Sequence, residues 1–206
     1  MSYEKQIKEK KDDESFKDDR LNIPVLKYFW QASPLSASQK SSVHKFLRKV
    51  NIFDNFSDFE LRRFSQFLHL RNFHHGEKIF AQGSGGFGFY LVFSGNVDIL
   101  TEGKGEEEFS EHLVATLGPC EYFGELSLLE ERNVRNATAQ ARDGVTLLAF
   151  FKPDLSEMIE RHPVVAAKLL QAVSLIVARR FNRVAVEIKA LKEKLKLLQS
   201  ESNEES

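Results

Sequence analysis

Six short apolar segments between residues 77 and 151 constrain the fold more than any other feature of the chain. They are EKIFAQG, FGFYLVF, NVDIL, HLVATL, ATAQA and VTLLAFF, and glycines and polar clusters separate them. Runs of this length with turns between them are typical of an all-β sandwich or barrel. The chain also has 18 Phe against 4 Tyr and 1 Trp, so we expect a β domain with a core built mainly from Phe.

Two of these segments, FYLVF and NVDIL, predict a β-hairpin, with Ser94, Gly95 and Asn96 supplying the turn. The sequence GSGGFG at 83–88 matches the dinucleotide pattern G-x-G-x-x-G. That pattern requires a helix directly after it, because the helix N-terminus holds the pyrophosphate. A strand follows here instead. We interpret 83–88 as a flexible connection between two antiparallel strands, with its glycines meeting steric needs.

Helices are expected on both sides of the β region. Residues 36–50 predict a short helix, and Ser57 with Glu60 forms a capping box that begins another. The kinase-like sequence RRFS at 62–65 lies in that second helix, so a solvated charged face is its preferred interpretation. Beyond the β region, Pro153 begins one helix, and Pro163 begins a long one continuing to about Leu198.

Bulk properties exclude several classes of protein. The net charge of −1 does not favour nucleic acid as a partner. Cys120 is the single cysteine, so no disulfide can form within the chain. No apolar run reaches the length of a membrane span, and the charged N-terminus lacks the apolar core of a signal peptide. We expect a cytoplasmic protein. No metal-ligand spacing and no nucleophile–base pair points to an enzyme.

The segment from 122 to 141 has the chemistry of a ribose-phosphate site. Gly124 lets a ligand approach the backbone, and the residues after it predict about two turns of helix, whose free N–H groups attract an anion. Arg135 can fork onto two phosphate oxygens, and Glu125 can accept a hydrogen bond from a sugar hydroxyl. From the residues alone, a structural ion pair between Glu125 and Arg135 explains this pattern about equally well.

The ordered set of motifs resembles the cyclic nucleotide-binding domain family. The set comprises NIFDNFSDFELRRFSQFLHLRNFHHGEKIFAQGS, FYLVFSGNVDIL and FGELSLL…VRNATAQA, and the last is similar to that family's phosphate-binding cassette. The resemblance implies mainly β structure: an eight-stranded antiparallel, jelly-roll-like β-roll with N-terminal helices and a long C-terminal helix. The implied organisation is a disordered charged tail at 1–20, a helical extension at 21–56, the binding domain at 57–180, and a coiled-coil helix with a polar tail at 181–206.

The resemblance also implies a binding site for cAMP, or for cGMP, with no further cofactor. Glu125 would bind the ribose 2′-hydroxyl and Arg135 the cyclic phosphate. The sequence departs from the family at Val134, which replaces a frequent Pro, and in a cassette loop about one residue longer than usual. Val184 and Ala185 replace a hydroxyl pair that contacts adenine. The full set of expected ligand-binding residues is Phe123, Gly124, Glu125, Leu126, Ser127, Arg135, Asn136, Ala137, Asn182 and Arg183.

The end of the long helix carries an apolar seam that predicts a homodimer. Phe181, Val184, Ile188, Leu191, Leu195 and Leu198 are spaced 3, 4, 3, 4 and 3 residues apart, which is almost three heptads. Glu187 and Lys192 fall at flanking positions that favour a parallel pair. We expect a stand-alone, non-enzymatic receptor with an unidentified effector and no DNA or membrane partner. The alternatives are a degenerate fold acting as an interaction scaffold and a relative of the transcription regulators.

Overall fold

The structure is a computed structural model that describes residues 37–103, 110–130 and 134–204. The expected charged tail at 1–20 and most of the expected extension at 21–56 lie outside these residues. The chain divides into two compact units, Met1–Ala167 and Lys168–Ser206, and each is described by itself. In the described part of the chain, no helix is long and apolar enough to cross a bilayer.

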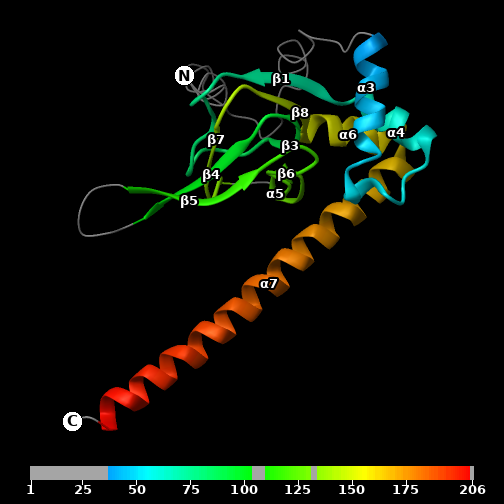
Figure 1. Cartoon of the computed structure of the whole chain (residues 1–206). Helices are drawn as coiled ribbons and strands as arrows, with labels where there is room; N and C mark the ends of the chain where they lie inside the picture. The colour runs from blue at the N-terminus through cyan, green and yellow to red at the C-terminus, as the bar shows by residue number, and fades with distance from the viewer. Residues whose placement is uncertain (1–36, 104–109, 131–133, 205–206) are drawn as a thin grey trace, which may run out of the picture. The chain divides into compact units, whose positions relative to one another are not determined.

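The first unit is a β-roll made of two four-stranded sheets (Figure 1). The strand order is β1-β8-β3-β6 in one sheet and β2-β7-β4-β5 in the other, and neighbouring strands in each sheet pair antiparallel. The expected eight-stranded antiparallel fold with flanking helices is therefore confirmed. The strands are β1 His69–Phe73, β2 Lys78–Phe80, β3 Gly88–Ser94, β4 Val97–Gly103, β5 Ser110–Leu117, β6 Tyr122–Phe123, β7 Thr138–Ala141 and β8 Val145–Phe151.

Strand β8 contributes phenylalanine side chains to two parts of the core. Its side chains alternate between the two faces of the sheet, and both faces are buried. Phe151 belongs to the cluster inside the roll. Phe150 lies on the other face, where its ring centroid is 5.3 Å from that of Phe64 in the helical layer. Aromatic side chains therefore join the helices to one sheet and also fill the roll.

The expected hairpin between FYLVF and NVDIL is wrong. The two segments form β3 and β4 as successive strands, but β3 lies in one sheet and β4 in the other. Between them, Gly95 has φ +80°, and a Cβ at this position would collide with the carbonyl oxygen of Gly144. The turn therefore passes the chain from one sheet to the other, and the local pattern of two strands around a glycine does not distinguish these outcomes.

Asp143, in the turn between β7 and β8, forms hydrogen bonds with the turn that joins β3 to β4. Its carboxylate accepts hydrogen bonds from the backbone N–H of Asn96 at 2.8 Å and from the side-chain amide of Asn96 at 3.0 Å. Both hydrogen bonds lower the pKa of Asp143 below its usual value of 3.8, and the bond from the backbone N–H of Asn96 has the larger effect. The ionised carboxylate therefore stabilises the fold above pH 4, and this contribution is lost as the pH falls through the lowered pKa.

We expect Asp143→Ala to lower the melting temperature at pH 7. The difference from the parent should shrink steadily between pH 5 and pH 2, because protonation removes the same interaction from the parent. Thermal unfolding of both proteins across this range measures the effect. A difference that stays constant with pH would show that the charge of Asp143 does not contribute.

The N-terminal helical layer consists of α3 Ala37–Leu47, the 3₁₀ turn η1 Asn51–Phe53 and α4 Asp58–Ser65. The capping box at the start of α4 is confirmed: Ser57 Oγ accepts from the N–H of Glu60, and a Glu60 carboxylate oxygen accepts from the N–H of Ser57. Ser65 is buried, and its hydroxyl donates to the carbonyl oxygen of Arg62 at 2.9 Å. The RRFS sequence is thus closed to a kinase, as the preferred interpretation requires.

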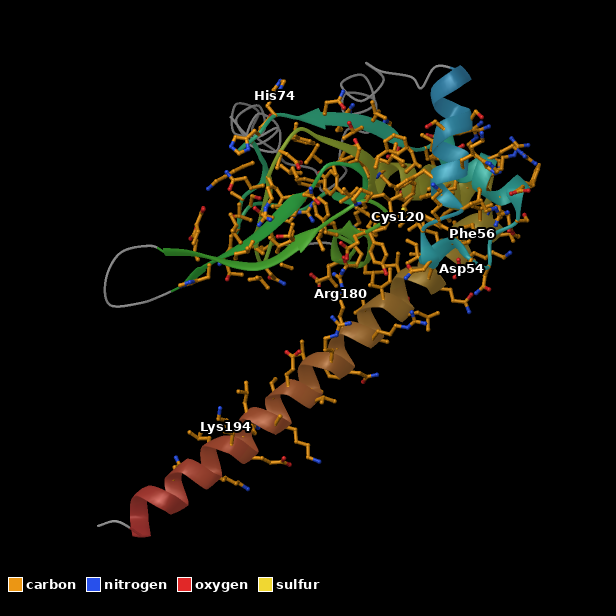
Figure 2. The ribbon with its side chains drawn as sticks, in the orientation of Figure 1. Asp54, Phe56, His74, Cys120, Arg180 and Lys194 are labelled. Carbon is orange, nitrogen blue, oxygen red and sulfur yellow. The ribbon has the colours of Figure 1, made fainter. Side chains whose placement is uncertain are left out.

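Two helices follow the roll, α6 Lys152–Arg161 and α7 Pro163–Glu204. Pro153 is the second residue of α6 rather than the first. Helix α7 begins at Pro163 as expected and has 42 residues, so it continues past Leu198, its expected end. The second unit consists of the part of α7 from Lys168 on, where labelled side chains such as Lys194 are exposed to solvent (Figure 2).

Candidate cyclic nucleotide site

Arg135 is buried although its side chain is charged, since only 4% of the residue is exposed. Its guanidinium carbon lies 3.9 Å from the ring centroid of Phe80 and 5.8 Å from that of Tyr90. One terminal nitrogen, Nη2, donates to the carbonyl oxygen of Gly88 at 2.9 Å. Cation–π contact and a backbone acceptor thus position the cation at the inner wall of the roll. Sequence analysis missed Phe80, because nothing in EKIFAQG distinguishes a core ring from a ring beneath a guanidinium.

Both the backbone conformation at position 124 and the atoms around it favour glycine there. Its φ is +78°, a left-handed conformation that glycine adopts without strain. A Cβ on this residue would lie 2.6 Å from the carbonyl oxygen of Gly88 and 2.7 Å from Nη1 of Arg135. The glycine therefore allows the guanidinium of Arg135 to lie directly against the backbone, and the expected approach of a ligand at this point stays a prediction.

The helix expected after Gly124 is shorter than predicted. It is a single turn, α5 Leu126–Leu129, and Glu130 already has extended backbone angles. The N–H of Ser127 donates to the carbonyl oxygen of Gly124 at 3.1 Å, so this N–H is used inside the turn. Part of the expected backbone cradle is therefore already occupied. Short isolated helices are marginal, so the helix-forming residues after Gly124 did not determine the helix length.

Glu125 and Ser127 are both buried in this turn, at 3% and 0% exposure. Glu125 stands at the N-cap position but does not cap α5 with its side chain. The hydroxyl oxygen of Ser127 is buried and has no hydrogen-bond partner among the described residues. Together with Arg135 they form a group of buried polar residues, here named the polar cluster: Glu125, Ser127 and Arg135.

The glycine-rich stretch 83–88 forms a wall of the polar cluster. The N–H of Gly83 donates to the carbonyl oxygen of Arg135 at 2.8 Å, and the N–H of Arg135 donates to that of Ser84 at 2.9 Å. A Cβ on Gly86 would lie 2.7 Å from Ser127 Oγ and 2.9 Å from Arg135 Nε. The stretch links β2 and β3, which lie in different sheets, so it is not a flexible connection between paired strands. Its glycines are steric, as expected.

The other expected site residues are placed as follows. Phe123 is a core residue whose ring stacks on Tyr90 with centroids 5.2 Å apart. Leu126 and Ala137 are half-buried, and Asn136 is exposed beside the polar cluster. Asn182 and Arg183 are exposed residues of α7 in the second unit, so their contact with the base stays a prediction. The longer cassette loop, at 131–133, lies outside the described residues.

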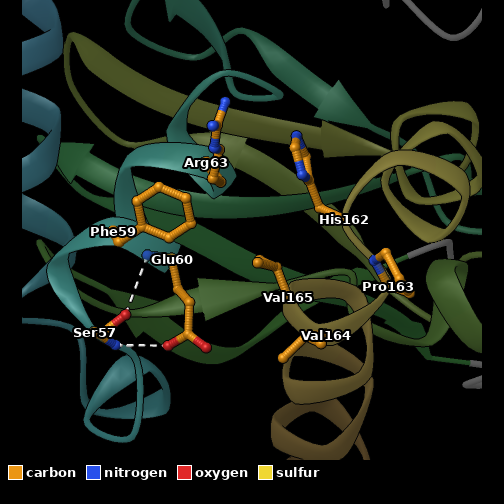
Figure 3. A pocket seen from close by; sticks show the side chains of 8 residues that line it. All are labelled: Ser57, Phe59, Glu60, Arg63, His162, Pro163, Val164 and Val165. Atoms are coloured by element: carbon orange, nitrogen blue, oxygen red, sulfur yellow. Dashed lines mark hydrogen bonds between the residues drawn. The ribbon is translucent and has the colours of Figure 1, made fainter.

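A separate hollow with a volume of about 300 Å³ lies in the first unit between the start of α4 and the α6–α7 junction (Figure 3). Phe59, Val164 and Val165 give it an apolar lining. Ser57 and Glu60 also line it, but their hydrogen bonds to each other form the capping box. Arg63 and His162 are its other polar lining residues, and the hollow includes no residue of the polar cluster, so it is separate from the candidate site.

Among the described residues, the histidines and the cysteine form no second candidate site. Within the described ranges, no group of three His, Cys, Asp or Glu side chains could hold a metal ion. Cys120 is half-buried in a turn with φ +71°, where its N–H donates to the carbonyl oxygen of Val92 (Figure 2). The polar cluster is therefore the site to which sequence and geometry both point.

The structure thus combines an eight-stranded roll with a buried arginine beside a glycine that has a positive φ. The cyclic nucleotide-binding domain model matches residues 70–162. The chain belongs to the cyclic nucleotide-binding domain family. This result confirms the resemblance that the motifs indicated.

Relatives in sequence and structure agree with this assignment. The cyclic AMP receptor protein of Thermus thermophilus is 38% identical over 125 residues, which are 61% of this chain and 54% of that protein. The cAMP-dependent protein kinase regulatory subunit of Schizosaccharomyces pombe is 31% identical over 59% of this chain and 27% of its own length. The matched region thus spans about half of one relative and a quarter of the other.

Solved structures show the same fold. The Thermus thermophilus catabolite activator protein superposes with a TM-score of 0.60 at 34% identity, over 68% of this chain and 62% of that one. The N-terminal domain of a transcriptional regulator from Streptomyces coelicolor gives a TM-score of 0.57 at 30% identity, over 68% of this chain and 94% of that one.

Proposed function

We propose that this protein is a stand-alone, non-enzymatic receptor for a cyclic nucleotide, with cAMP as the favoured ligand and cGMP as a competitor. The observation that carries the proposal is the burial of Arg135 at 4% exposure within a domain of the cyclic nucleotide-binding family. Relatives named as a cyclic AMP receptor protein and a cAMP-dependent kinase regulatory subunit support the choice of ligand.

Each member of the proposed site has a separate task. Arg135 would pair with the cyclic phosphate, since a guanidinium binds two oxygens at once. Phe80 and the carbonyl oxygen of Gly88 already orient it, so less rotamer entropy is lost on binding. Glu125 would accept from the ribose 2′-hydroxyl, and Gly124 would let the phosphate reach the backbone. The N–H groups of Asn136 and Ala137 would complete the cradle.

Binding would be read out through the C-terminal helix. A ligand shifts an equilibrium between two helix positions only by its difference in affinity for them. Helix α7 begins two residues after the end of α6, so a displacement of α6 reaches it directly along the chain. In this proposal the moved helix, as part of a homodimer, changes its contacts with an effector protein.

Calorimetric titration of the full chain with cAMP, cGMP and a cyclic dinucleotide tests the proposal. We expect saturable binding of one nucleotide per chain for cAMP, weaker binding of cGMP and none of the larger dinucleotide. Absence of binding by both mononucleotides would contradict the receptor role. It would favour the interaction scaffold, in which the polar cluster has only a structural part.

Asn136 is expected to tune the choice between the two bases. The resemblance places it beside the purine, and its amide both donates and accepts, so it can serve adenine or guanine. A net hydrogen bond is worth about 0.5–1.5 kcal/mol, or roughly two- to twelvefold in affinity. Asn136→Ala should shift the cAMP/cGMP affinity ratio by about that factor and leave phosphate binding intact. Paired titrations of parent and variant measure it.

An unchanged ratio would remove Asn136 from base recognition. Asn182 and Arg183 on α7 are then the next residues to replace. Val184 and Ala185 lack hydroxyls, so they cannot supply the adenine contact through their side chains. The discrimination between cAMP and cGMP should therefore be modest in the parent.

A transcription-regulator role is the second candidate. It is favoured by the relatives, because two of the similar structures are a catabolite activator protein and part of a transcriptional regulator. The net charge of −1 argues against a strong DNA-binding face. A filter-binding or mobility-shift assay with mixed-sequence duplex DNA, with and without cAMP, separates the two candidates.

A further inference from the structure

The hollow between the start of α4 and the α6–α7 junction exposes apolar side chains that the proposed function does not use. Phe59 and Val164 lie on opposite sides of it and are 59% and 65% exposed (Figure 3). Among the phenylalanines that the structure describes, only Phe59 and Phe181 are exposed, and Phe181 belongs to the seam of α7. Exposed apolar groups beside polar ones are typical of an interaction surface. The hollow therefore calls for an occupant.

Two polar residues of the lining, Arg63 and His162, both contact aromatic rings. The guanidinium carbon of Arg63 lies 5.0 Å from the ring centroid of Phe59. The ring of His162 meets that of Phe67 edge-on, with centroids 6.0 Å apart. Of the aromatic side chains, tryptophan is the strongest partner for a cation. A hollow of about 300 Å³ with apolar walls and a guanidinium therefore suits an inserted aromatic side chain.

Residues 21–31, with the sequence LNIPVLKYFWQ, contain side chains of this kind. They lie outside the described residues. Seven of these eleven residues are large and apolar or aromatic, and Trp30 is the single tryptophan of the chain. A segment of this composition favours contact with apolar surface over contact with water. It is therefore a candidate occupant from within the same chain.

The segment is near enough in the chain to reach the hollow. Helix α3 begins at Ala37 and has 11 residues, so it is about 16 Å long. Directly after its C-terminal end, Nε of Arg48 donates to Asp58 Oδ1 at 2.8 Å, which places this end of α3 at the start of α4. An extended chain from Trp30 to Ala37 spans up to about 25 Å. Trp30 can therefore reach back along α3 to the hollow.

We propose that residues 21–31 dock in the hollow of their own chain, with Trp30 as the inserted side chain. Its ring would lie between Phe59 and Val164 and face the guanidinium of Arg63. The covalent link gives the segment an effective concentration of about 1 mM, so a dissociation constant of about 0.1 mM for the separate peptide would still leave it docked about 90% of the time. Docking would cover the residues that join α6 to α7. The inference does not depend on the proposed function, and its test uses no nucleotide.

Intrinsic fluorescence of the full chain tests the inference, because its single tryptophan, Trp30, reports on this segment alone. We expect emission at a shorter wavelength than that of a synthetic peptide of residues 21–31. The acrylamide quenching constant should be several-fold smaller than that of the peptide, because a docked ring is shielded from solvent. Parent values equal to those of the free peptide would overturn the inference.

Two variants of the lining locate the ring. Phe59→Ala removes one wall of the hollow, and Val164→Lys places a charge in the other, so each should move the emission and the quenching constant towards the values of the free peptide. Both parent residues are exposed, and melting temperatures check that the variants are folded. A tryptophan that is shielded in the parent and unaffected by both substitutions would lie elsewhere, and the inference would fail.

Val114→Lys serves as the control, because Val114 is 62% exposed on β5 and does not line the hollow. This variant should keep the fluorescence of the parent, and a shift as large as that of Val164→Lys would overturn the inference. Docking within one chain is independent of concentration, so the quenching constant should stay constant on about a hundredfold dilution. A constant that rises on dilution would place the segment in the hollow of a second copy, contrary to the inference.

Discussion

Arg135→Glu should reduce cAMP affinity by at least roughly 30- to 5,000-fold, the equivalent of the 2–5 kcal/mol typical of losing one partner of a buried charged pair. The parent guanidinium is 4% exposed and held between Phe80 and the carbonyl oxygen of Gly88. A carboxylate in its place would repel the phosphate at the same position. Titration calorimetry of parent and variant with cAMP measures the loss.

Two further variants show whether the loss is specific. Arg135→Lys keeps the charge but lacks the planar fork, so its affinity should fall between those of the parent and the Glu variant. Arg62→Glu reverses a charge on the exposed face of α4 and should bind like the parent. Melting temperatures confirm that each protein is folded. If Arg135→Glu is folded and binds cAMP like the parent, the cassette assignment is wrong.

The strand content was predictable from the sequence, whereas the pairing of the strands was not. Short β-rich segments with glycine turns identified a β domain, and the capping box at Ser57 marked the start of α4 correctly. The two strands around Gly95 were wrongly expected to pair. A turn that contains a residue with positive φ can join two strands that pair in a hairpin, and it can equally join two strands that lie in different sheets. The difference here depends on long-range contacts with the β7–β8 turn, including those made by Asp143.

The residues of the polar cluster could be predicted from the sequence, but the residues that pack around them could not. From the residues alone, Glu125 and Arg135 fitted a ribose-phosphate site and a structural ion pair about equally well, and the structure buries both. The sequence showed neither that Phe80 lies beneath the guanidinium nor that Gly86 borders it. Both residues come from segments about 50 positions earlier in the chain. Their closeness to Arg135 results from the pairing of 83–85 with 134–135, which no local pattern reveals.

We expect the exposed seam of α7 to pack against a second copy of the chain. Phe181, Val184, Ile188, Leu191 and Leu195 are 48–71% exposed, and they recur at the a and d positions of a heptad. Leu198 continues the pattern in the sequence, but its side chain lies outside the described residues. Large apolar side chains in a continuous stripe are rare on monomers. A parallel pair of such helices would bury the stripe and place Glu187 near Lys192 of the other copy.

We therefore expect substitutions in the seam to change the oligomeric state. Replacing Ile188 and Leu195 together with Lys should convert a dimer of twice 23.6 kDa into a 23.6 kDa monomer in multi-angle light scattering. Lysine is a good helix former, so the helix should persist while charge repulsion separates the two copies at the seam.

Val186→Lys is the matched control, because Val186 is 68% exposed but lies off the seam. Truncation after Arg180 should also give a monomer and preserve the β fold. A double variant or truncated chain that stays dimeric would place the interface elsewhere, and dissociation of the Val186 variant would show that the heptad pattern does not define it.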